Sequence, residues 1–432
     1  MKKVLIFTYY WPPAGGPGVQ RFLKFSKYLG EFGIEPIIVT VNDGAYPYLD
    51  ESLIKDIPKD LKVYKTNTYE PFRLYNLIRG KKGKFSSVGM IGVRDSSSIF
   101  HKFSKFIRAN FFIPDARKGW KKYAVKKAVE IISKEKIDAI ITTGPPHSTH
   151  LIGLQLKQTL NTSWIADMRD PWPNILNIKD LPRTIIAKKQ DERLKDKVLK
   201  SADYITTVSH GLKNHIIVKN ENIQVIHNGY DEEDIFKGEP GKSENFFLSY
   251  IGNFKPDQNV PVLWQTLKSL SEELPGFKEF FKLNFTGILE NTILQDIRSF
   301  GLGNMVLVEE FVPHIEATKK MHLSSMLLFV IPQSDNNKLI TTGKLFEYMA
   351  SRTPMLSIGP VAGDAAKLIN EAGRDKMVDY YDKDAIKNLI LKYYQKWLDD
   401  DKSLCKFPEG DLRELTRKKQ TEKLSKIIFS IL

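Results

Sequence analysis

The feature that most constrains this chain is a repeated alternation of short apolar runs with amphipathic helical stretches such as 121–134 and 184–200. This alternation predicts an α/β protein with parallel, doubly wound sheets, because helices connect parallel strands and cover both faces of each sheet. In the first half, strands are predicted at 4–8, 36–41, 61–66, 139–142, 163–166, 204–208 and 223–226. A second series is predicted at 247–251, 282–286, 306–309, 326–331 and 355–358.

The two series of strands predict two Rossmann-like domains that face each other across a cleft. With 432 residues, the chain is long enough for two domains with sizeable cores. The acidic, glycine-containing segment DEEDIFKGEPGKSENF separates the series and is typical of a linker. We therefore expect an N-terminal domain at 1–231, a linker at 232–246 and a C-terminal domain at 247–408. We expect residues 409–432 to form a final amphipathic helix that returns to the N-terminal domain.

The composition narrows the class of protein and its location. The single cysteine, Cys405, excludes an internal disulfide framework and suits a reducing cytosol. The first apolar run is too short for a signal-peptide core and is interrupted by Pro12 and Pro13. No stretch approaches the roughly 20 apolar residues that a spanning helix needs. We expect a cytoplasmic protein, or one attached only peripherally to the inner face of the cell membrane.

The net charge of +14 is concentrated in one region, because residues 72–127 contain 15 Lys or Arg against two acids. Basic and aromatic residues at helical spacing suit an anionic membrane surface, which we expect residues 73–127 to contact. The same charge could serve nucleic acid, and an ordinary helix with its phenylalanines in the core is a third interpretation. We expect no nucleic-acid partner, because that function would not explain the motifs described below. The apolar residues that alternate with basic residues in this region are Phe100, Phe103, Phe106, Ile107, Phe111 and Phe112.

The string YYWPPAGGPGVQRF connects the first predicted strand to a helix through a loop that has almost no side chains. Gly15 and Gly16 allow positive φ and the close approach of another molecule to the main chain. The amides at the start of the following helix form a potential anion site, most often for phosphate. The spacing matches neither the Walker pattern nor the dinucleotide fingerprint, and a tight connection without a ligand is the alternative.

Five strings, taken in order, resemble the retaining glycosyltransferases of the GT-B fold, in particular the bacterial Asp-x-Arg-Asp-Pro-Trp branch of family 4. They are YYWPPAGGPGVQRF, WIADMRDPW, ADYITTVSHGLKNHI with VIHNGYDEEDIF, SYIGNFKPDQNVPVLWQTL, and TTGKLFEYMASRTPML. Each string alone is a weak or moderate signal. Their order and spacing cover nearly the whole chain, and the resemblance implies two Rossmann-like domains and a nucleotide-sugar donor.

The resemblance places the donor mainly on the C-terminal domain. It implies that Glu347 accepts hydrogen bonds from both ribose hydroxyls, which suits the several acceptor sites of a carboxylate. A solvated helix glutamate is the alternative. The amides of Thr342, Gly343 and Lys344, together with the Lys344 ammonium, can hold a diphosphate at a helix start. Gly15 and Gly16 would present backbone to the same sugar-diphosphate, which would be of UDP or GDP type, and no separate cofactor is expected.

The chain departs from the family pattern at two places. Many members carry a second glutamate eight residues before Glu347, where this chain has Leu339. Members also commonly carry an arginine and a lysine after the first strand of the second domain. Here Asn253, Gln258 and Asn259 stand at about those places, and Lys255 is the one cation. Lys255 and Lys344 would neutralise the leaving diphosphate, with Arg169 helping across the cleft.

Three candidate catalytic residues follow predicted strands of the N-terminal domain. Arg169 and Asp170 occupy roughly the places of a histidine–aspartate pair near the reacting sugar in many relatives, and a buried structural Arg–Asp pair is the alternative. His147 and His150 stand three apart at a helix start, and one of them is expected to face the cleft. A capping or packing role is the alternative for His150. No Asp, Glu or His set has metal-ligand spacing, so we expect metal-independent chemistry.

The resemblance implies a retaining glycosyltransferase of hexosyl or N-acetylhexosaminyl type. The acceptor would be a hydroxyl of a lipid-linked or surface-polysaccharide precursor, and the diphosphate would leave from the front face. Such a route depends on positioning and charge stabilisation more than on a protein nucleophile. The alternatives are a nucleotide-sugar epimerase of the same shape, or a basic surface-binding module without catalysis.

Overall fold

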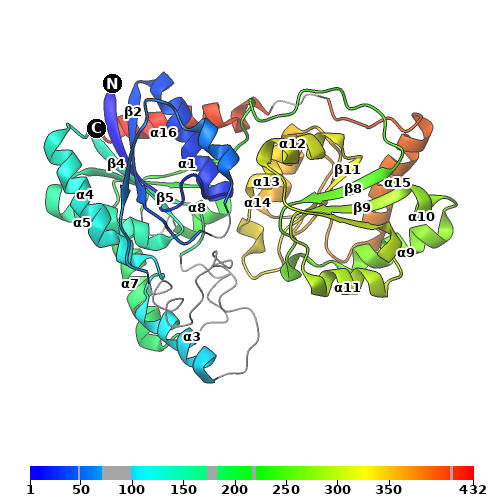
Figure 1. The fold of residues 1–432 in the computed structure, drawn as a ribbon, viewed down its shortest axis with the longest axis horizontal. Coiled ribbons are helices and arrows are strands. Elements are labelled where there is room, and N and C mark those ends of the chain that lie inside the picture. Colours follow the sequence, from blue (N-terminus) through cyan, green and yellow to red (C-terminus); the bar gives the residue numbers. More distant parts are fainter. Residues whose placement is uncertain (47–48, 71–98, 173–181, 217–219, 409–411) are drawn as a thin grey trace. The chain divides into compact units, whose positions relative to one another are not determined.

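The computed structural model describes residues 1–46, 49–70, 99–172, 182–216, 220–408 and 412–432. The chain forms two compact units (Figure 1). Unit 1 comprises Met1–Asn228 and Arg417–Leu432, and unit 2 comprises Gly229–Thr416. Within the described parts, no helix is long and apolar enough to cross a membrane.

Among the described residues, unit 1 contains a parallel sheet with the strand order β3-β2-β1-β4-β5-β6-β7. The predicted strands are confirmed, each within two residues at either end. The chain moves from one side of β1 to the other between β3 and β4, which marks the carboxyl ends of β1 and β4 as the favoured ligand position. The strands are β1 (Lys2–Phe7), β2 (Ile34–Val41), β3 (Lys62–Thr66), β4 (Ala139–Gly144), β5 (Ser163–Met168), β6 (Tyr204–Thr207) and β7 (Ile223–Val225).

Helices cover both faces of this sheet, so the strands are apolar on both sides (Figure 1). Val4 and Ile6 pack towards α1 and α16, whereas Leu5 and Phe7 pack towards α4, α5 and α7. This is the two-residue alternation of a strand. The described helices of the unit are α1 (Pro17–Tyr28), α3 (Ile99–Phe111), α4 (Lys121–Lys134), α5 (His150–Leu160), α7 (Ile185–Ser201), α8 (His210–Ile216) and α16 (Arg417–Ser430).

In the described part of unit 2, the predicted strands form a smaller parallel sheet with the strand order β10-β9-β8-β11-β12. Its order reverses between β8 and β11. The strands are β8 (Phe246–Ile251), β9 (Phe281–Thr286), β10 (Val306–Glu309), β11 (Met326–Val330) and β12 (Met355–Ile358). The helices are α9 (Pro261–Glu273), α10 (Phe277–Phe280), α11 (Asn291–Ser299), α12 (His314–Leu323), α13 (Gly343–Ala350), α14 (Asp364–Glu371) and α15 (Lys383–Asp399).

The connections between the units differ in detail from the sequence-based boundaries. The segment 232–246 belongs to unit 2, where the Ser243 amide donates to the Lys402 carbonyl and the Leu404 amide to the Gly241 carbonyl. The final α-helix begins only at Arg417. Before it, Arg413–Leu415 forms a separate 3-10 turn whose Leu415 carbonyl accepts from the Tyr230 amide, and Thr416 is extended and bridges to Tyr230. Helix α16 then packs on α1 within unit 1 and adds three apolar side chains to its core, Leu424, Ile427 and Ile428.

Candidate active site

The glycine loop lies after β1 in unit 1, at the carboxyl edge of the sheet. Gly16 is the N-cap of α1 and has φ 112, a backbone conformation that side chains disfavour. No side chain caps this end of the helix. The Asp50 amide donates to the Pro13 carbonyl at 2.8 Å and fixes the loop from the other side. The predicted strand–glycine loop–helix order is therefore present.

Arg169 lies over the first turn of α1. A Cβ added to Gly18 would come within 2.3 Å of the Arg169 Nη1, so a larger residue at this position would require the guanidinium to shift. The Arg169 amide donates to the Gly144 carbonyl, and its Nη2 donates to the Pro145 carbonyl at 2.8 Å. The structure thus brings Arg169 to the glycine loop. Burial raises the pKa of the neighbouring Asp170 carboxyl, and the Arg169 charge opposes that rise.

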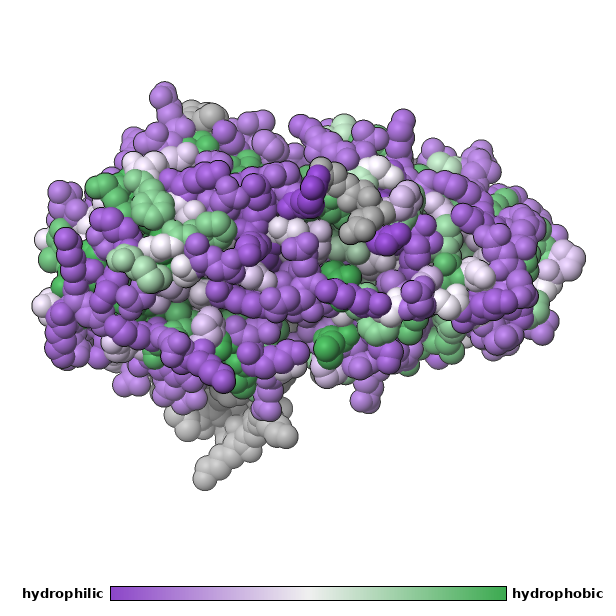
Figure 2. Space-filling view, turned by 90° about the horizontal axis from the view of Figure 1, so that it is seen from above, coloured by the Kyte–Doolittle hydropathy of each residue, from purple (hydrophilic) through white to green (hydrophobic). Residues whose placement is uncertain are grey.

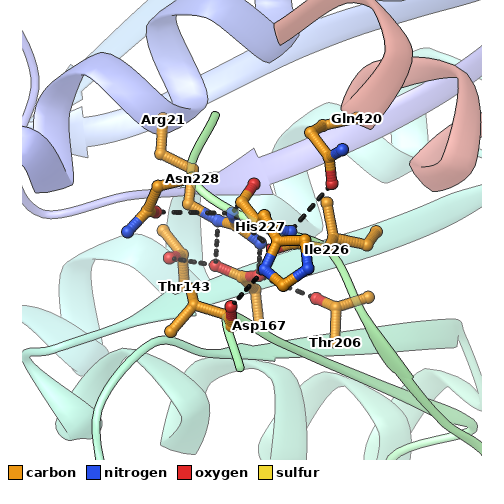
Figure 3. A network of polar contacts seen from close by, with 9 residues as sticks. Arg21, Thr143, Asp167, Thr206, Ile226, His227, Asn228 and Gln420 are labelled. Carbon is orange, nitrogen blue, oxygen red and sulfur yellow. Dashed lines mark hydrogen bonds and ion pairs between the residues drawn. The ribbon is translucent and has the colours of Figure 1, made fainter. Parts of the chain in front are cut away.

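A second Arg–Asp pair of this region, formed by Arg21 of α1 and Asp167 of β5, is fully buried. Their side chains are 0% and 1% exposed, and Arg21 Nη2 lies 2.8 Å from Asp167 Oδ1. Thr143 and Thr206 also donate to the carboxylate, and Arg21 donates to the carbonyls of Ile226 and His227 (Figure 3). Burial alone would raise the pKa of Asp167, but the charge and hydrogen bonds of Arg21 lower it. The carboxylate is thus kept ionised.

This network joins the ends of several elements at the edge of the sheet. Arg21 comes from α1, and Asp167, Thr143 and Thr206 come from β5, β4 and β6. Gln420 of α16 accepts from the His227 amide at 2.8 Å. Sequence reasoning missed the network. Asp167 is the first residue of the string DMRDPW and lies within β5, where strand alternation places its side chain on the face opposite to that of Met168.

His147 and His150 are both buried, 5% and 0% exposed. His147 stacks on Trp172 with ring centroids 4.9 Å apart, and its Nε2 lies 3.2 Å from the Pro171 carbonyl. His150 Nδ1 lies 2.9 Å from Thr142 Oγ1, which supports the packing role considered for His150. Burial lowers the pKa of His147 to about 4 and that of His150 to about 3, so both rings are neutral at pH 7.

Gly144 is the meeting point of these groups. A Cβ at this position would lie 2.5 Å from His150 Nε2 and 3.2 Å from His147 Nδ1. Neither ring nitrogen has a hydrogen-bond partner among the described residues. Because the Gly144 carbonyl also binds the Arg169 amide, the end of β4 connects both histidines to the arginine. His147 and Arg169 therefore share one neighbourhood, while their catalytic roles stay predictions.

In unit 2, α13 begins at Gly343 with Thr342 as its N-cap and no side-chain capping bond. Lys344 Nζ donates to the Tyr250 hydroxyl at 2.6 Å and lies 4.0 Å from the centre of that ring. A Cβ on Gly252, whose φ is +118, would lie 2.5 Å from the same ammonium. The start of α13 and the end of β8 thus meet at the Lys344 ammonium. A cation beside the first amides of a helix is what a diphosphate site requires.

Glu347 lies one turn further along α13 and is held by a residue that sequence reasoning did not identify. His314 Nε2 lies 3.0 Å from Glu347 Oε1, and Asp234 Oδ2 lies 3.9 Å from His314 Nδ1. All three side chains are between 15% and 19% exposed, so the group is mostly buried. His314 is the first residue of α12, and Asp234 comes from the segment predicted as a linker.

The polar residues considered as substitutes for the family's cations have structural roles. Gln258 accepts from the Lys255 amide and donates to the Val330 carbonyl. Asn259 bonds to Asp296 and to the Trp264 indole, a role unrelated to a ligand. Lys255 is the N-cap of the short turn Pro256–Gln258 after β8, and Leu339 is half-buried in the turn Asn337–Leu339. Among the described residues, no group of three or more His, Cys, Asp or Glu could hold a metal ion.

The chain has two units, each with a doubly wound parallel sheet whose carboxyl edge carries loops of the kind that bind ligands. This architecture is the GT-B fold. This chain is similar to the solved structure of WaaG, a glycosyltransferase involved in lipopolysaccharide biosynthesis. The match covers 98% of this chain and 99% of the WaaG chain, with TM-score 0.57 and 11% sequence identity. This chain is also similar to S. aureus TarM, solved as a G117R mutant in complex with fondaparinux, α-GlcNAc-glycerol and UDP. That match covers 100% of this chain and 99% of the TarM chain, with TM-score 0.57 and 12% sequence identity.

A Listeria monocytogenes protein assigned as a UDP-N-acetylglucosamine 2-epimerase also has this fold, with TM-score 0.54 and 11% identity over 100% of this chain and 96% of its own. At these identities the likeness concerns the fold alone. No protein-family model matches the chain, and no curated protein matches its sequence.

Proposed function

We propose that this protein is a retaining glycosyltransferase of the family 4 group. It would move a hexosyl or N-acetylhexosaminyl unit from a UDP- or GDP-type sugar to a hydroxyl of a glycan or lipid-linked acceptor. Such a reaction belongs to cell-surface polysaccharide or glycolipid synthesis. The observation that carries the proposal is the start of α13, where Lys344 reaches Tyr250 and Gly252 and Glu347 lies one turn away.

The donor nucleotide would bind unit 2. The diphosphate would lie at the first amides of α13, at Thr342, Gly343 and Lys344, where the helix dipole and the ammonium both favour negative charge. Glu347 would accept from the ribose hydroxyls through an oxygen oriented by His314. Lys255 would supply the second cation, and Leu339 implies that the sugar is recognised by other groups than the usual glutamate.

In the reaction, the bond between the anomeric carbon and the diphosphate oxygen breaks, and the acceptor oxygen bonds to the same face of that carbon. The acceptor proton passes to the departing diphosphate, so neither a metal nor a protein nucleophile is required. Arg169, which lies beside Gly18 in the first turn of α1, would stabilise developing negative charge. A neutral His147 suits a role in hydrogen bonding to a sugar hydroxyl, and Asp170 would orient the acceptor.

The proposal is tested by a donor screen that follows nucleoside-diphosphate release with and without lipid-linked acceptors. Acceptor-dependent release from a UDP or GDP sugar, with the α or β configuration of the donor kept in the product, is the expected result. Release with the configuration inverted would refute retention. No release from any donor with any acceptor, in protein that binds the nucleoside diphosphate, would refute transfer.

Epimerisation of a nucleotide sugar is the second candidate, because an assigned epimerase shares the fold over the whole chain. The two candidates differ in their products. An epimerase converts the sugar in the absence of any acceptor and exchanges a carbon-bound hydrogen with solvent. Deuterium incorporation into the recovered donor sugar would favour the epimerase, whereas an unlabelled sugar supports the transferase.

A transferase acting on lipid-linked acceptors would be cytoplasmic and associate peripherally with the inner face of the cell membrane. The stretch expected to contact an anionic surface is 73–127, of which residues 73–98 lie outside the described residues. Support for this location comes from the described remainder of that stretch, where Phe103, Phe106 and Phe111 are exposed.

A further inference from the structure

The ammonium of Lys344, the cation of the proposed donor site, is held in place by Tyr250. Its Nζ donates to the Tyr250 hydroxyl at 2.6 Å and lies 4.0 Å from the centre of the ring. Hydrophilic residues predominate on the faces of both units seen in Figure 2, and a lysine on such a surface has a hydrated ammonium on a flexible stem. Lys344 is half-buried instead, with its ammonium fixed over Gly252.

The contacts of the Tyr250 hydroxyl determine which atoms donate and which accept. An ammonium can only donate, so the hydroxyl accepts from Lys344 and its own proton points elsewhere. The Asn253 carbonyl lies 3.1 Å away and accepts that proton. The hydroxyl also accepts from Gln258 Nε2 at 3.1 Å. Because the donor and acceptor positions of this oxygen are occupied, the hydroxyl keeps a lone pair directed at the ammonium.

Gln258 is itself oriented by the backbone. Its Oε1 accepts from the Lys255 amide at 3.2 Å, and its Nε2 donates to the Val330 carbonyl at 2.9 Å. These contacts identify the two ends of the side-chain amide, because a backbone N–H only donates and a carbonyl only accepts. The second Nε2 proton then faces the Tyr250 hydroxyl, from which Oε1 is farther, at 3.3 Å. Lys255 follows β8 and Val330 ends β11, so the chain of contacts begins where the strand order reverses.

Two protons of the Lys344 ammonium remain for a ligand. Among the described residues, Tyr250 is its one hydrogen-bond partner, and the ammonium forms no ion pair. The adjoining start of α13 has no side-chain capping bond, and the buried hydroxyls of Thr341 and Thr342 have no partner within the described parts of the chain. A helix start and a cation both favour negative charge. The ligand that these atoms suit is therefore an anion with several acceptor oxygens, such as a diphosphate.

We propose that Tyr250 and Gln258 are positioning residues that fix the Lys344 ammonium to receive the diphosphate of the donor nucleotide. Neither residue would touch the ligand. They act by holding the cation at the start of α13 before the ligand arrives, so that binding does not have to order a long, flexible side chain. The inference rests on the proposed function for the place of the donor, and it adds the groups on which the cation depends.

The test measures binding of UDP and GDP to the full-length protein by calorimetry. Tyr250→Phe removes the hydroxyl and keeps the ring, which contacts Phe254 with ring centroids 4.6 Å apart. This change should weaken binding of the nucleoside diphosphate roughly fivefold, the effect of one hydrogen bond. Lys344→Met should weaken it roughly 30-fold, because a charged donor is lost. Tyr250→Phe made in the Lys344→Met protein should then have almost no effect, because no ammonium remains to be positioned.

Two further variants separate positioning from a general loss of packing. Gln258→Met keeps the length of the side chain but cannot donate to the Tyr250 hydroxyl, and it should weaken binding only while Lys344 is present. Tyr393→Phe is the matched control, because Tyr393 is a buried tyrosine of the same core whose hydroxyl donates to Asp375. This control should bind the nucleoside diphosphate as the unmodified protein does. Urea denaturation of each variant checks that it is folded.

The outcomes distinguish this inference from the proposed function. Unchanged affinity in the Tyr250→Phe protein, an equal loss with and without Lys344, or an equal loss in the Tyr393→Phe control would overturn the inference while leaving the donor site in place. Unchanged affinity in the Lys344→Met protein would overturn the donor site and the inference with it. The result does not depend on the donor screen, because nucleotide binding needs neither an acceptor nor transfer.

Discussion

Acidification should destabilise unit 1 well above the pH at which carboxylates titrate. His147, His150 and His227 are held neutral by burial, which lowers the pKa of these side chains to about 4, about 3 and about 4 respectively, from 6.5. Below pH 6.5 the unfolded chain binds a proton at each position and the folded chain does not, so stability falls as the pH falls. Above pH 6.5 this contribution is fully present.

The size of this loss of stability follows from the difference in the number of protons bound by the unfolded and the folded chain. Between pH 7.5 and 5.5 each such histidine removes about 1.3 kcal/mol from the free energy of unfolding, or about 4 kcal/mol for the three together. That is a large share of the 5–15 kcal/mol typical of a domain. The loss should be measured by urea denaturation followed by tryptophan fluorescence, with hydrogen exchange of the β4 and β5 amides to report on unit 1.

Variants separate the histidines from other titrating groups. His150→Gln should reduce the pH dependence by about a third, whatever its effect on stability at pH 7.5. His215→Gln, at an exposed position of α8, is the matched control and should keep the full dependence. Stability that stays constant between pH 7.5 and 5.5, or a His150→Gln protein with the full dependence, would refute the reasoning.

Three further predictions concern the site and its support. Glu347→Ala should weaken nucleoside-diphosphate binding by about 1.5–3 kcal/mol in calorimetry, the range of a charge-assisted hydrogen bond, and unchanged affinity would remove Glu347 from the site. Turnover should survive excess chelator, and a loss restored by manganese or magnesium would contradict metal-free chemistry. Asp167→Asn should cost about 3–5 kcal/mol in unfolding free energy, because the buried Arg21 charge is left uncompensated. Arg21→Met combined with Asp167→Leu should cost less than the two single changes together, and strict additivity in urea denaturation would argue against a coupled pair.

The sheets could be predicted because their strands are apolar on both faces and are separated by helical stretches. Runs such as β4 and β11 carry this signal in the sequence itself, as does the start of α13 at Gly343. Contacts between distant residues carry no such local signal. Arg21 meets Asp167, and Glu347 meets His314, only because the strand order brings their elements to one edge of a sheet.

The apolar region around α3 shows a second limit of sequence reasoning. Helical periodicity marks a helix as amphipathic, but it does not say whether the apolar side faces the core or solvent. The structure exposes Phe103, Phe106 and Phe111, and it adds Ile185 and Ile186 from a segment about 80 residues away. The start of the final helix was also misjudged, because the pairing of Tyr230 with Leu415 is invisible in a local pattern.

The return of α16 to unit 1 has a consequence for how the protein is made. Leu424, Ile427 and Ile428 complete a core whose other members, such as Phe22 and Leu23, are synthesised before all of unit 2. Unit 2 is continuous in sequence, so it has all of its residues before the last helix is translated. The domain encoded first is therefore the one that finishes folding last, and a nascent chain that stalls before residue 417 exposes the apolar side of α1 to chaperones and proteases.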